Sequence, residues 1–328
     1  MSNWIADDLG DGYEQLTIAL GGDPDGEGSI DATLVRRTPP AAVEGAVIYV
    51  HGFSDYFFQT ELADFFTDRG YAFYALDLRK CGRSRRDGHT GHFVSDLALY
   101  DAELDQALAI VKEETGDKPV LLSGHSTGGL VLSLWLDRLN KKPGGTAGAG
   151  IAGLVLNSPW FDLQGKPWMR SVGTKAIAGV AKVKPTSPVK LPPSDAYGSS
   201  LHVSAHGEWE FNTSFKPLNG FPVTFGWLTA IRRGHAQLHK GLNIGVPSLV
   251  LRSSKTRFAR TWTEDVDEAD AVLDVKQIAR WAGCLGDAVT SLPIENAKHD
   301  VFISKEEPRK AAYAAVDAWL RSSRLINA

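Results

Sequence analysis

A serine between two glycines gives the strongest chemical signal in this sequence. Residues 124–128 read Gly-His-Ser-Thr-Gly, a match to Gly-x-Ser-x-Gly, between an apolar run typical of a strand, 119–123, and a helical run, 129–139. Glycines at these places permit a sharp strand-to-helix turn, which exposes the serine hydroxyl where backbone N–H groups converge on a developing oxyanion. We therefore predict that Ser126 is a nucleophile.

A serine hydroxyl is a weak nucleophile at neutral pH, so it needs a histidine base that a carboxylate orients. Proteins that use this turn in a strand-helix context place the acid and then the histidine after the serine along the chain. Of nine histidines, His299 is the one that follows the last predicted strand, 288–294, and precedes the last predicted helix, 306–324. We predict His299 as the base, with a surface-loop histidine as the alternative.

The acid is expected on the loop after the predicted strand 247–252. The candidates there are Asp265, Asp267, Asp270 and Asp274. Asp274 stands three residues before Gln277 at the start of a helical pattern, which is a capping-box arrangement. Asp265 and Asp267 lie in an acidic cluster that is typical of a solvated loop. Asp270 is the preferred acid, while Asp265 and Asp267 stay open because the loop is unusually long.

Two backbone N–H groups should form the oxyanion hole. One belongs to Thr127, directly after the nucleophile, and the other should come from the loop after an earlier strand. His51-Gly52-Phe53 occupies that place, which makes the N–H of Phe53 the second donor, with Gly52 allowing a close approach. His51 itself could be read as a base, but its position at a strand end suits a structural hydrogen bond.

The elements that must position these residues alternate between strand and helix. Two runs around a Gly- and Asp-rich turn, 13–20 and 30–37, predict an N-terminal antiparallel hairpin. Further along, the alternation predicts an α/β fold with a mostly parallel, doubly wound sheet. The predicted strands are 46–50, 72–78, 119–123, 151–157, 247–252 and 288–294. The predicted helices are 61–69, 97–111, 129–139, 275–284 and 306–324. Residues 144–150, which are rich in glycine, predict a flexible loop.

One interval, residues 160–239, breaks the alternation. It contains a proline-rich stretch, 184–193, and many large aromatic residues, and we interpret it as a cap inserted over the carboxyl edge of the sheet. The core would then comprise residues 1–159 and 240–328. The aromatic residues are Trp168, Trp209, Phe211, Phe215, Phe221, Phe225 and Trp227. As a set above a serine, some of them should line an apolar acyl site.

These features resemble the α/β-hydrolases of the monoacylglycerol lipase, lysophospholipase and serine aminopeptidase group. Its members share a His-Gly loop, a Gly-His-Ser-x-Gly-Gly turn, an Asp-x-Val acid segment and a C-terminal histidine. These are matched here at 51–52, 124–129, 270–272 and His299. The resemblance covers 43–156 and 246–320, and implies the α/β-hydrolase fold with a mobile cap. The sequence departs from the group at Lys80-Cys81 and in the acid, which lies further after its strand than is usual.

The composition and charge of the chain limit the binding partners that we expect. The formal charge of −4 and the scattered Lys and Arg give no reason to expect nucleic acid as a partner. No stretch resembles a signal peptide or a membrane span, so a cytoplasmic location is the default expectation. Cys81 and Cys284 are expected to be free thiols. His235 and His239 lack a third metal ligand, and His89 and His92 suit a surface loop. We expect no cofactor and no metal, and a homodimer stays open.

The sequence thus predicts a serine hydrolase of carboxylic esters, with lipid-like substrates of the monoacylglycerol or lysophospholipid type implied by the resemblance. The triad is Ser126, Asp270 and His299. A thioesterase, an amidase or an acyltransferase with the same triad is the alternative, and a non-catalytic binding protein on this fold is a further one.

Overall fold

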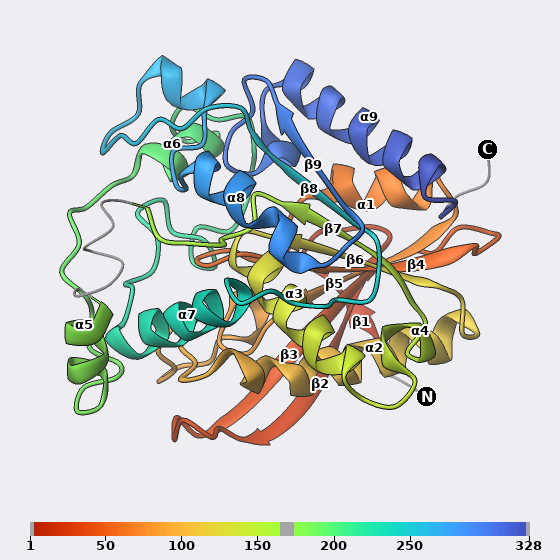
Figure 1. Cartoon of the computed structure of the whole chain (residues 1–328), viewed down its shortest axis with the longest axis horizontal. Helices are drawn as coiled ribbons and strands as arrows, with labels where there is room; N and C mark the ends of the chain where they lie inside the picture. Colours follow the sequence, from red (N-terminus) through yellow and green to blue (C-terminus); the bar gives the residue numbers. More distant parts are fainter. Residues whose placement is uncertain (1–2, 165–173, 326–328) are drawn as a thin grey trace.

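A single sheet runs through the molecule, and the computed structural model describes residues 3–164 and 174–325 of the chain (Figure 1). In that part the strand order is β1-β2-β3-β5-β4-β6-β7-β8-β9. β1 to β3 and the β3–β5 pair are antiparallel, and the other pairs are parallel. The strands are β1 (Ile5–Ala6), β2 (Tyr13–Gly22), β3 (Ser29–Arg37), β4 (Gly45–Val50), β5 (Tyr71–Asp77), β6 (Val120–His125), β7 (Ile151–Asn157), β8 (Ser248–Ser253) and β9 (Val289–Ile294).

The central strands β4, β5 and β6 are buried along their whole length. Continuous apolar runs form such strands because helices cover both faces of a parallel sheet. In the register, Val50 pairs with Gly124, and His125 pairs with Asn157. The carboxyl ends of β4, β6 and β7 therefore lie side by side, and the residues that follow these strands share one edge of the sheet.

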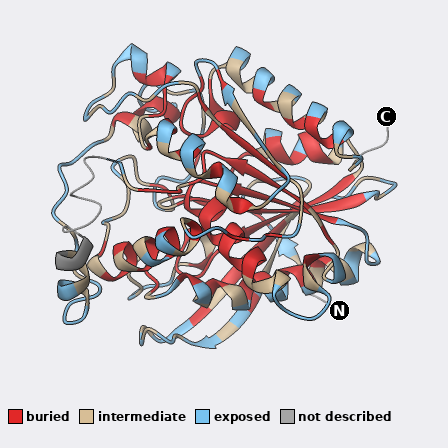
Figure 2. Cartoon of the chain, in the orientation of Figure 1, coloured by how far each residue is buried: buried red, intermediate tan, exposed pale blue. Residues whose placement is uncertain are grey.

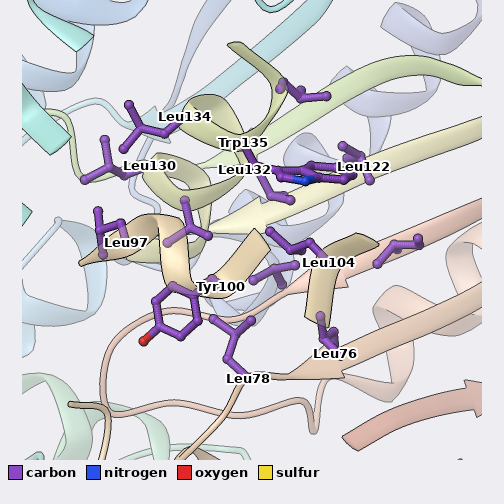
Figure 3. Close-up of a cluster of buried hydrophobic side chains, with 14 of the residues drawn as sticks. Leu76, Leu78, Leu97, Tyr100, Leu104, Leu122, Leu130, Leu132, Leu134 and Trp135 are labelled. Carbon is purple, nitrogen blue, oxygen red and sulfur yellow. The ribbon is translucent and has the colours of Figure 1, made fainter. Parts of the chain in front are cut away.

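Two layers of helices enclose the sheet, and Figure 2 shows that burial is concentrated in the sheet and on the helix surfaces facing it. α1 (Thr60–Thr67) and α9 (Glu306–Ser322) pack on one face, and α2 (Asp101–Thr115), α3 (Thr127–Asn140) and α8 (Val275–Trp281) on the other. Figure 3 shows side chains of β6, α2 and α3 interlocking in the second layer. Each large apolar side chain buried there stabilises the fold by roughly 1.5–3 kcal/mol.

The connection between β7 and β8, residues 158–247, coincides with the interval that breaks the strand-helix alternation. It carries α5 (Thr174–Ala181), α6 (Ala196–Leu201) and α7 (Phe225–Leu238); α5 packs beside α7, and α6 lies apart from them on the same side of the view (Figure 1). Phe211 and Trp227 of this connection are buried. Trp168 lies outside the described residues.

Three details differ from the sequence predictions. The helix expected from Leu97 begins with a 3₁₀ turn, Leu97–Tyr100, before α2. The glycine-rich segment 144–150 contains a helical turn, α4 (Gly145–Gly148), because Asn140 Oδ1 accepts hydrogen bonds from the backbone and hydroxyl of Thr146 (3.5 and 3.3 Å). α3 begins at Thr127, two residues earlier than predicted. Within the described ranges, no helix is both long and apolar enough to cross a membrane.

Candidate active site

Ser126 occupies the turn between β6 and α3 in a strained backbone conformation, with φ 51° and ψ −116°. A residue with a Cβ adopts a positive φ only where surrounding contacts enforce it. Here the backbone N–H of Ser126 donates to the carbonyl of Asn157 (2.9 Å). The carbonyl of Ser126 accepts from the N–H groups of Gly129 and Trp160 (3.1 and 3.0 Å). These three bonds hold the serine at the end of the strand.

Close backbone packing explains the glycines around the serine. A Cβ at Gly128 would lie 2.4 Å from the carbonyl oxygen of His51 and 2.5 Å from that of Val50. A Cβ at Gly52 would lie 3.0 Å from the Cβ of Ser126. The loop after β4 therefore packs directly against the serine turn.

His299 and Asp270 form a buried pair, although 29 residues separate them. His299 Nδ1 lies 2.9 Å from Asp270 Oδ2. Asp270 Oδ1 accepts from the backbone N–H groups of Val272 and Leu273 (2.8 and 2.7 Å). His299 is 2% exposed and Asp270 is 0% exposed. With its Nδ1 turned to the carboxylate, the imidazole has Nε2 left to exchange a proton with a substrate or a serine.

The route of the chain to Asp270 explains why the acid lies so far along the sequence. After β8 the chain makes an excursion, residues 257–269, and returns to form a parallel bridge between Thr256 and Asp270. The N–H of Asp270 donates to the carbonyl of Lys255, and the carbonyl of Asp270 accepts from the N–H of Arg257 (both 2.9 Å). Asp270 therefore lies beside the end of β8 despite the long loop.

The other three acid candidates are engaged elsewhere. Asp265 pairs with Arg257 on the surface, where both side chains are about half exposed. Asp267 Oδ1 lies 2.8 Å from the buried Lys298 Nζ. Asp274 caps α8, since its Oδ1 accepts from the N–H of Lys276 (3.0 Å). The structure brings only Asp270 of the four to His299.

The histidine loop reaches the serine turn through neighbouring residues. The ring of His125, which precedes Ser126, lies 4.9 Å from the ring of His299 between centroids. Asn157, whose carbonyl holds the N–H of Ser126, donates from Nδ2 to Asp300 Oδ1 (2.5 Å). Ser126 and His299 therefore belong to one buried cluster at the carboxyl edge of the sheet.

The two expected oxyanion donors belong to residues next to the serine or its packing partner Gly52. Thr127 is the first residue of α3, and the N–H groups of a first helical turn have no acceptor within their own helix. Phe53 follows Gly52, where an added Cβ would lie 3.0 Å from the Cβ of Ser126. His51 Nε2 accepts from the N–H of Leu78 (3.1 Å), so this histidine has the structural role expected of it.

Sequence reasoning missed a buried pair of charges next to the serine. Asp55 Oδ1 lies 2.7 Å from Lys216 Nζ, and Asp55 Oδ2 lies 3.1 Å from His125 Nδ1. Burial alone would raise the pKa of Asp55, but the Lys216 ammonium and the neighbouring imidazoles of His125 and His51 lower it well below its usual range. No local pattern in the sequence signals Lys216, because its partner lies 161 residues away.

Asp300 forms a second buried network that the sequence did not reveal. Besides the bond from Asn157, its Oδ2 accepts from Gln59 Nε2 (3.2 Å). The N–H of Phe302 donates to Asp300 Oδ1 (3.0 Å). This network joins the start of α1, the end of β7 and the histidine loop, and so holds the loop that carries His299.

We find no second reactive centre at Cys81, His92, His235 or His239. Cys81 Sγ lies 3.2 Å from His92 Nδ1. Burial raises the pKa of the Cys81 thiol and lowers that of His92, so both stay uncharged. His92 is buried between aromatic rings, and the expectation that it lies on the surface was wrong. His235 and His239 bond to the carbonyls of Trp160 and Phe161. Among the described residues no cluster suited to a metal ion is found.

Comparison with known proteins agrees with this architecture. Residues 41–264 match the model of a hydrolase family described as serine aminopeptidase, S33. A stretch of 127 residues, 38% of this chain, is 33% identical to phospholipase YtpA of Bacillus subtilis (strain 168), and spans 43% of that protein. The chain thus covers less than half of this curated relative.

Two solved structures are similar over nearly the whole chain. A soluble variant of the monoglyceride lipase of Saccharomyces cerevisiae, in complex with a substrate analogue, has a TM-score of 0.63 at 15% identity, covering 100% of this chain and 96% of that one. The monoacylglycerol lipase of Paleococcus ferrophilus has a TM-score of 0.63 at 17% identity, covering 89% and 98%. The fold is the α/β-hydrolase fold, and the chain belongs to the serine aminopeptidase (S33) family of hydrolases.

Proposed function

We propose that the protein hydrolyses carboxylic esters through an acyl-enzyme on Ser126. The observation that carries this proposal is the buried His299–Asp270 pair beside a serine held at positive φ. Ser126 Oγ attacks the ester carbonyl and gives its proton to His299 Nε2, while Asp270 stabilises the imidazolium. The N–H groups of Phe53 and Thr127 bind the oxyanion, and His299 protonates the leaving alcohol. Water then attacks the acyl group, with His299 as base, and releases the acid.

Lipid-like esters of the monoacylglycerol or lysophospholipid type are the proposed substrates. The named relative is a phospholipase, and two of the similar structures are a monoglyceride lipase and a monoacylglycerol lipase, which supports an acyl chain with a polar head group. In this chain the rings of Phe53 and Trp227 lie 4.1 Å apart, and Trp160 lies 5.6 Å from Trp227. These rings form an apolar wall on the side of the serine turn to which Trp160 is bonded, where an acyl chain would lie.

Residues 160–239, within the connection between β7 and β8, are proposed to act as a cap over the serine. Ser126 is largely buried, with 7% of its surface exposed. The description of the family as an aminopeptidase raises amide substrates as the alternative. A free amino terminus needs an anionic partner, and the buried carboxylates of Asp55, Asp270 and Asp300 are already bonded within the protein. Esters are therefore favoured over amino-terminal amides.

Labelling with a fluorophosphonate tests the nucleophile, and a substrate panel tests the class. Wild type should be labelled and Ser126→Ala should not; equal labelling of both would refute the proposal. The panel comprises p-nitrophenyl esters of increasing chain length, monoacylglycerols, a lysophospholipid, an acyl thioester and an aminoacyl anilide. Preference for the anilide would replace esterase by aminopeptidase, and preference for the thioester would replace it by thioesterase.

A further inference from the structure

The loop that carries the predicted oxyanion donor Phe53, residues 51–58, is bonded to one segment of the cap along most of its length. We call residues 51–58 the oxyanion loop and residues 211–227 the strap. Ser54 Oγ accepts from the backbone N–H of Phe221 (2.9 Å). The Tyr56 hydroxyl accepts from the backbone N–H of Asn212 (2.8 Å). Side chains of the loop thus take up backbone donors of the strap at two places.

Aromatic contacts accompany these bonds at three further places. The rings of Phe53 and Trp227 lie 4.1 Å apart, those of Tyr56 and Phe215 lie 5.3 Å apart, and those of Phe58 and Phe211 lie 4.9 Å apart. Aromatic pairs at such separations contribute about 0.5–1.5 kcal/mol each beyond their buried area. Side chains from Phe53 to Phe58 therefore lie against the strap at almost every position.

Lys216 stands at the centre of this contact. Its side chain is 8% exposed, and its Nζ lies 2.7 Å from Asp55 Oδ1 and 5.6–5.9 Å from the ring centroids of Phe58, Tyr197 and Phe211. A buried ion pair adds little net stability compared with an apolar replacement, because both charges lose their hydration. Stability alone therefore does not explain a lysine here, and its geometric effect on Asp55 is the better explanation.

Asp55 links Lys216 to the serine turn through its two carboxylate oxygens. While Oδ1 holds the ammonium, Oδ2 faces the N–H of Gly52 at 3.4 Å and His125 Nδ1 at 3.1 Å. Gly52 precedes Phe53, and His125 precedes Ser126. One carboxylate therefore connects the strap, the oxyanion loop and the nucleophile turn.

We propose that Lys216 is a positioning residue, through which the cap holds the oxyanion loop so that the Phe53 N–H faces the serine. This role rests on the proposed ester hydrolysis, since it acts on the transition state of that reaction. Loss of the contact should lower kcat while leaving KM within about threefold, because the oxyanion forms only after the substrate has bound. A displacement of about 1 Å at such a site can cost about 100-fold in rate.

The test compares Lys216→Met with Glu208→Gln. Glu208 also joins the cap to the core, through an exposed ion pair with Lys305 (2.7 Å), but it lies outside the strap. Two quantities are measured: kcat and KM per labelled serine, and hydrogen–deuterium exchange of the peptide that covers the oxyanion loop. Lys216→Met should lose about 10- to 100-fold in kcat and exchange at least about tenfold faster in that peptide. Glu208→Gln should match wild type in both.

The exchange measurement separates this inference from the proposed function. If wild type hydrolyses none of the esters but Lys216→Met still loosens the loop, the hold of Lys216 on the oxyanion loop stands, while ester hydrolysis and the role of that hold in it fall. If wild type is an esterase and Lys216→Met keeps its kcat and its exchange pattern, the positioning role is overturned while the esterase stands.

A double variant, Asp55→Asn/Lys216→Met, covers the case in which the unpaired Asp55 charge prevents Lys216→Met from folding. Removing both charges leaves no buried ion without a partner, so this variant should recover stability. Its kcat should stay at least about tenfold below that of wild type, because the charged contact between strap and loop is still missing. Recovery of the full kcat would show that Lys216 only neutralises Asp55.

Discussion

Residues 124–129 and residues 255–270 each bring one side chain to the same edge of the sheet, but their backbones differ in freedom. In the first segment a Cβ at Gly128 meets carbonyl oxygens at 2.4 and 2.5 Å, and every residue of the turn is fixed by its neighbours. In the second, thirteen residues leave the sheet and return, and the endpoint is set by the bridge between Thr256 and Asp270 together with the backbone hydrogen bonds of Asp270 to Lys255 and Arg257. A site of this kind needs its functional side chains held in place, while the course of the chain that leads to them can vary.

Removal of the carboxylate at that endpoint should have the largest effect. Asp270→Asn should lower kcat about 10⁴-fold, because an amide no longer orients the imidazole or stabilises its charged form. Steady-state hydrolysis of a p-nitrophenyl ester measures this. Asp265→Asn, on the same excursion but paired with Arg257 at the surface, is the matched control and should keep full activity. A kcat of Asp270→Asn within tenfold of wild type would move the acid to another residue.

One methyl group added at Gly128, in the closely packed serine turn, should destabilise the fold. Gly128→Ala should lower the free energy of unfolding by about 3 kcal/mol, since the contacting atoms belong to backbone that cannot move aside. Urea denaturation measures it. Gly148→Ala, whose added Cβ would meet no atom within 4 Å, should be neutral or slightly stabilising. Equal stabilities for the two variants would mean that the turn relaxes.

We also expect acid to destabilise the folded protein through His235, a buried histidine near the serine turn. Burial, and secondarily Arg232, lowers the pKa of His235 to about 3. Its Nε2 bonds to the carbonyl of Trp160, and the N–H of Trp160 donates to the carbonyl of Ser126. Between pH 6.5 and pH 3 the unfolded chain binds a proton that the folded chain does not, so stability falls as the pH falls. From pH 7 to pH 5 this loss should be about 2 kcal/mol.

Denaturation of wild type and of His235→Gln at both pH values isolates this contribution, because the variant should lack it. If wild type and His235→Gln lose the same free energy over this interval, His235 titrates with an ordinary pKa in the folded protein.

The smallest effect is expected on the excursion itself. Arg257→Gln removes an ion pair between two half-exposed side chains, and such pairs contribute about 0.2–1 kcal/mol. Thermal denaturation should therefore show a change of less than about 1 kcal/mol, and the kcat should be unchanged. A loss above 2 kcal/mol would show that the path of the excursion matters as much as its endpoint.

The sequence predicted those parts of the molecule whose signals are local. Alternating apolar runs gave the strands and most helices, and the glycines around Ser126 indicated the turn because each excludes a side chain there. Asp270 could be preferred over Asp274 because the spacing to Gln277 marks a helix cap, and the structure shows that cap. The catalytic roles of Ser126, Asp270, His299, Phe53 and Thr127 stay predictions that the experiments above test.

Contacts between distant segments could not be predicted in this way. Lys216 and Asp55 are 161 residues apart, and neither has a neighbour that marks it as buried. His92 was expected at the surface because it follows Gly91 in a turn-rich loop, but tertiary packing places its ring against Phe53 and Phe221. Helix α4 formed in a glycine-rich segment because Asn140, outside that segment, supplies an acceptor.

The bridge between Thr256 and Asp270 also makes the excursion a natural place for insertions. Because the chain leaves and rejoins the sheet at adjacent positions, added residues at its exposed tip around Arg260 and Thr261 need not displace the carboxylate. Lengthening such a loop costs only about 0.6 kcal/mol for each doubling. The fold thus offers an attachment point, for a tag, a binding peptide or a whole domain, close to the edge of the sheet that carries Ser126 and His299.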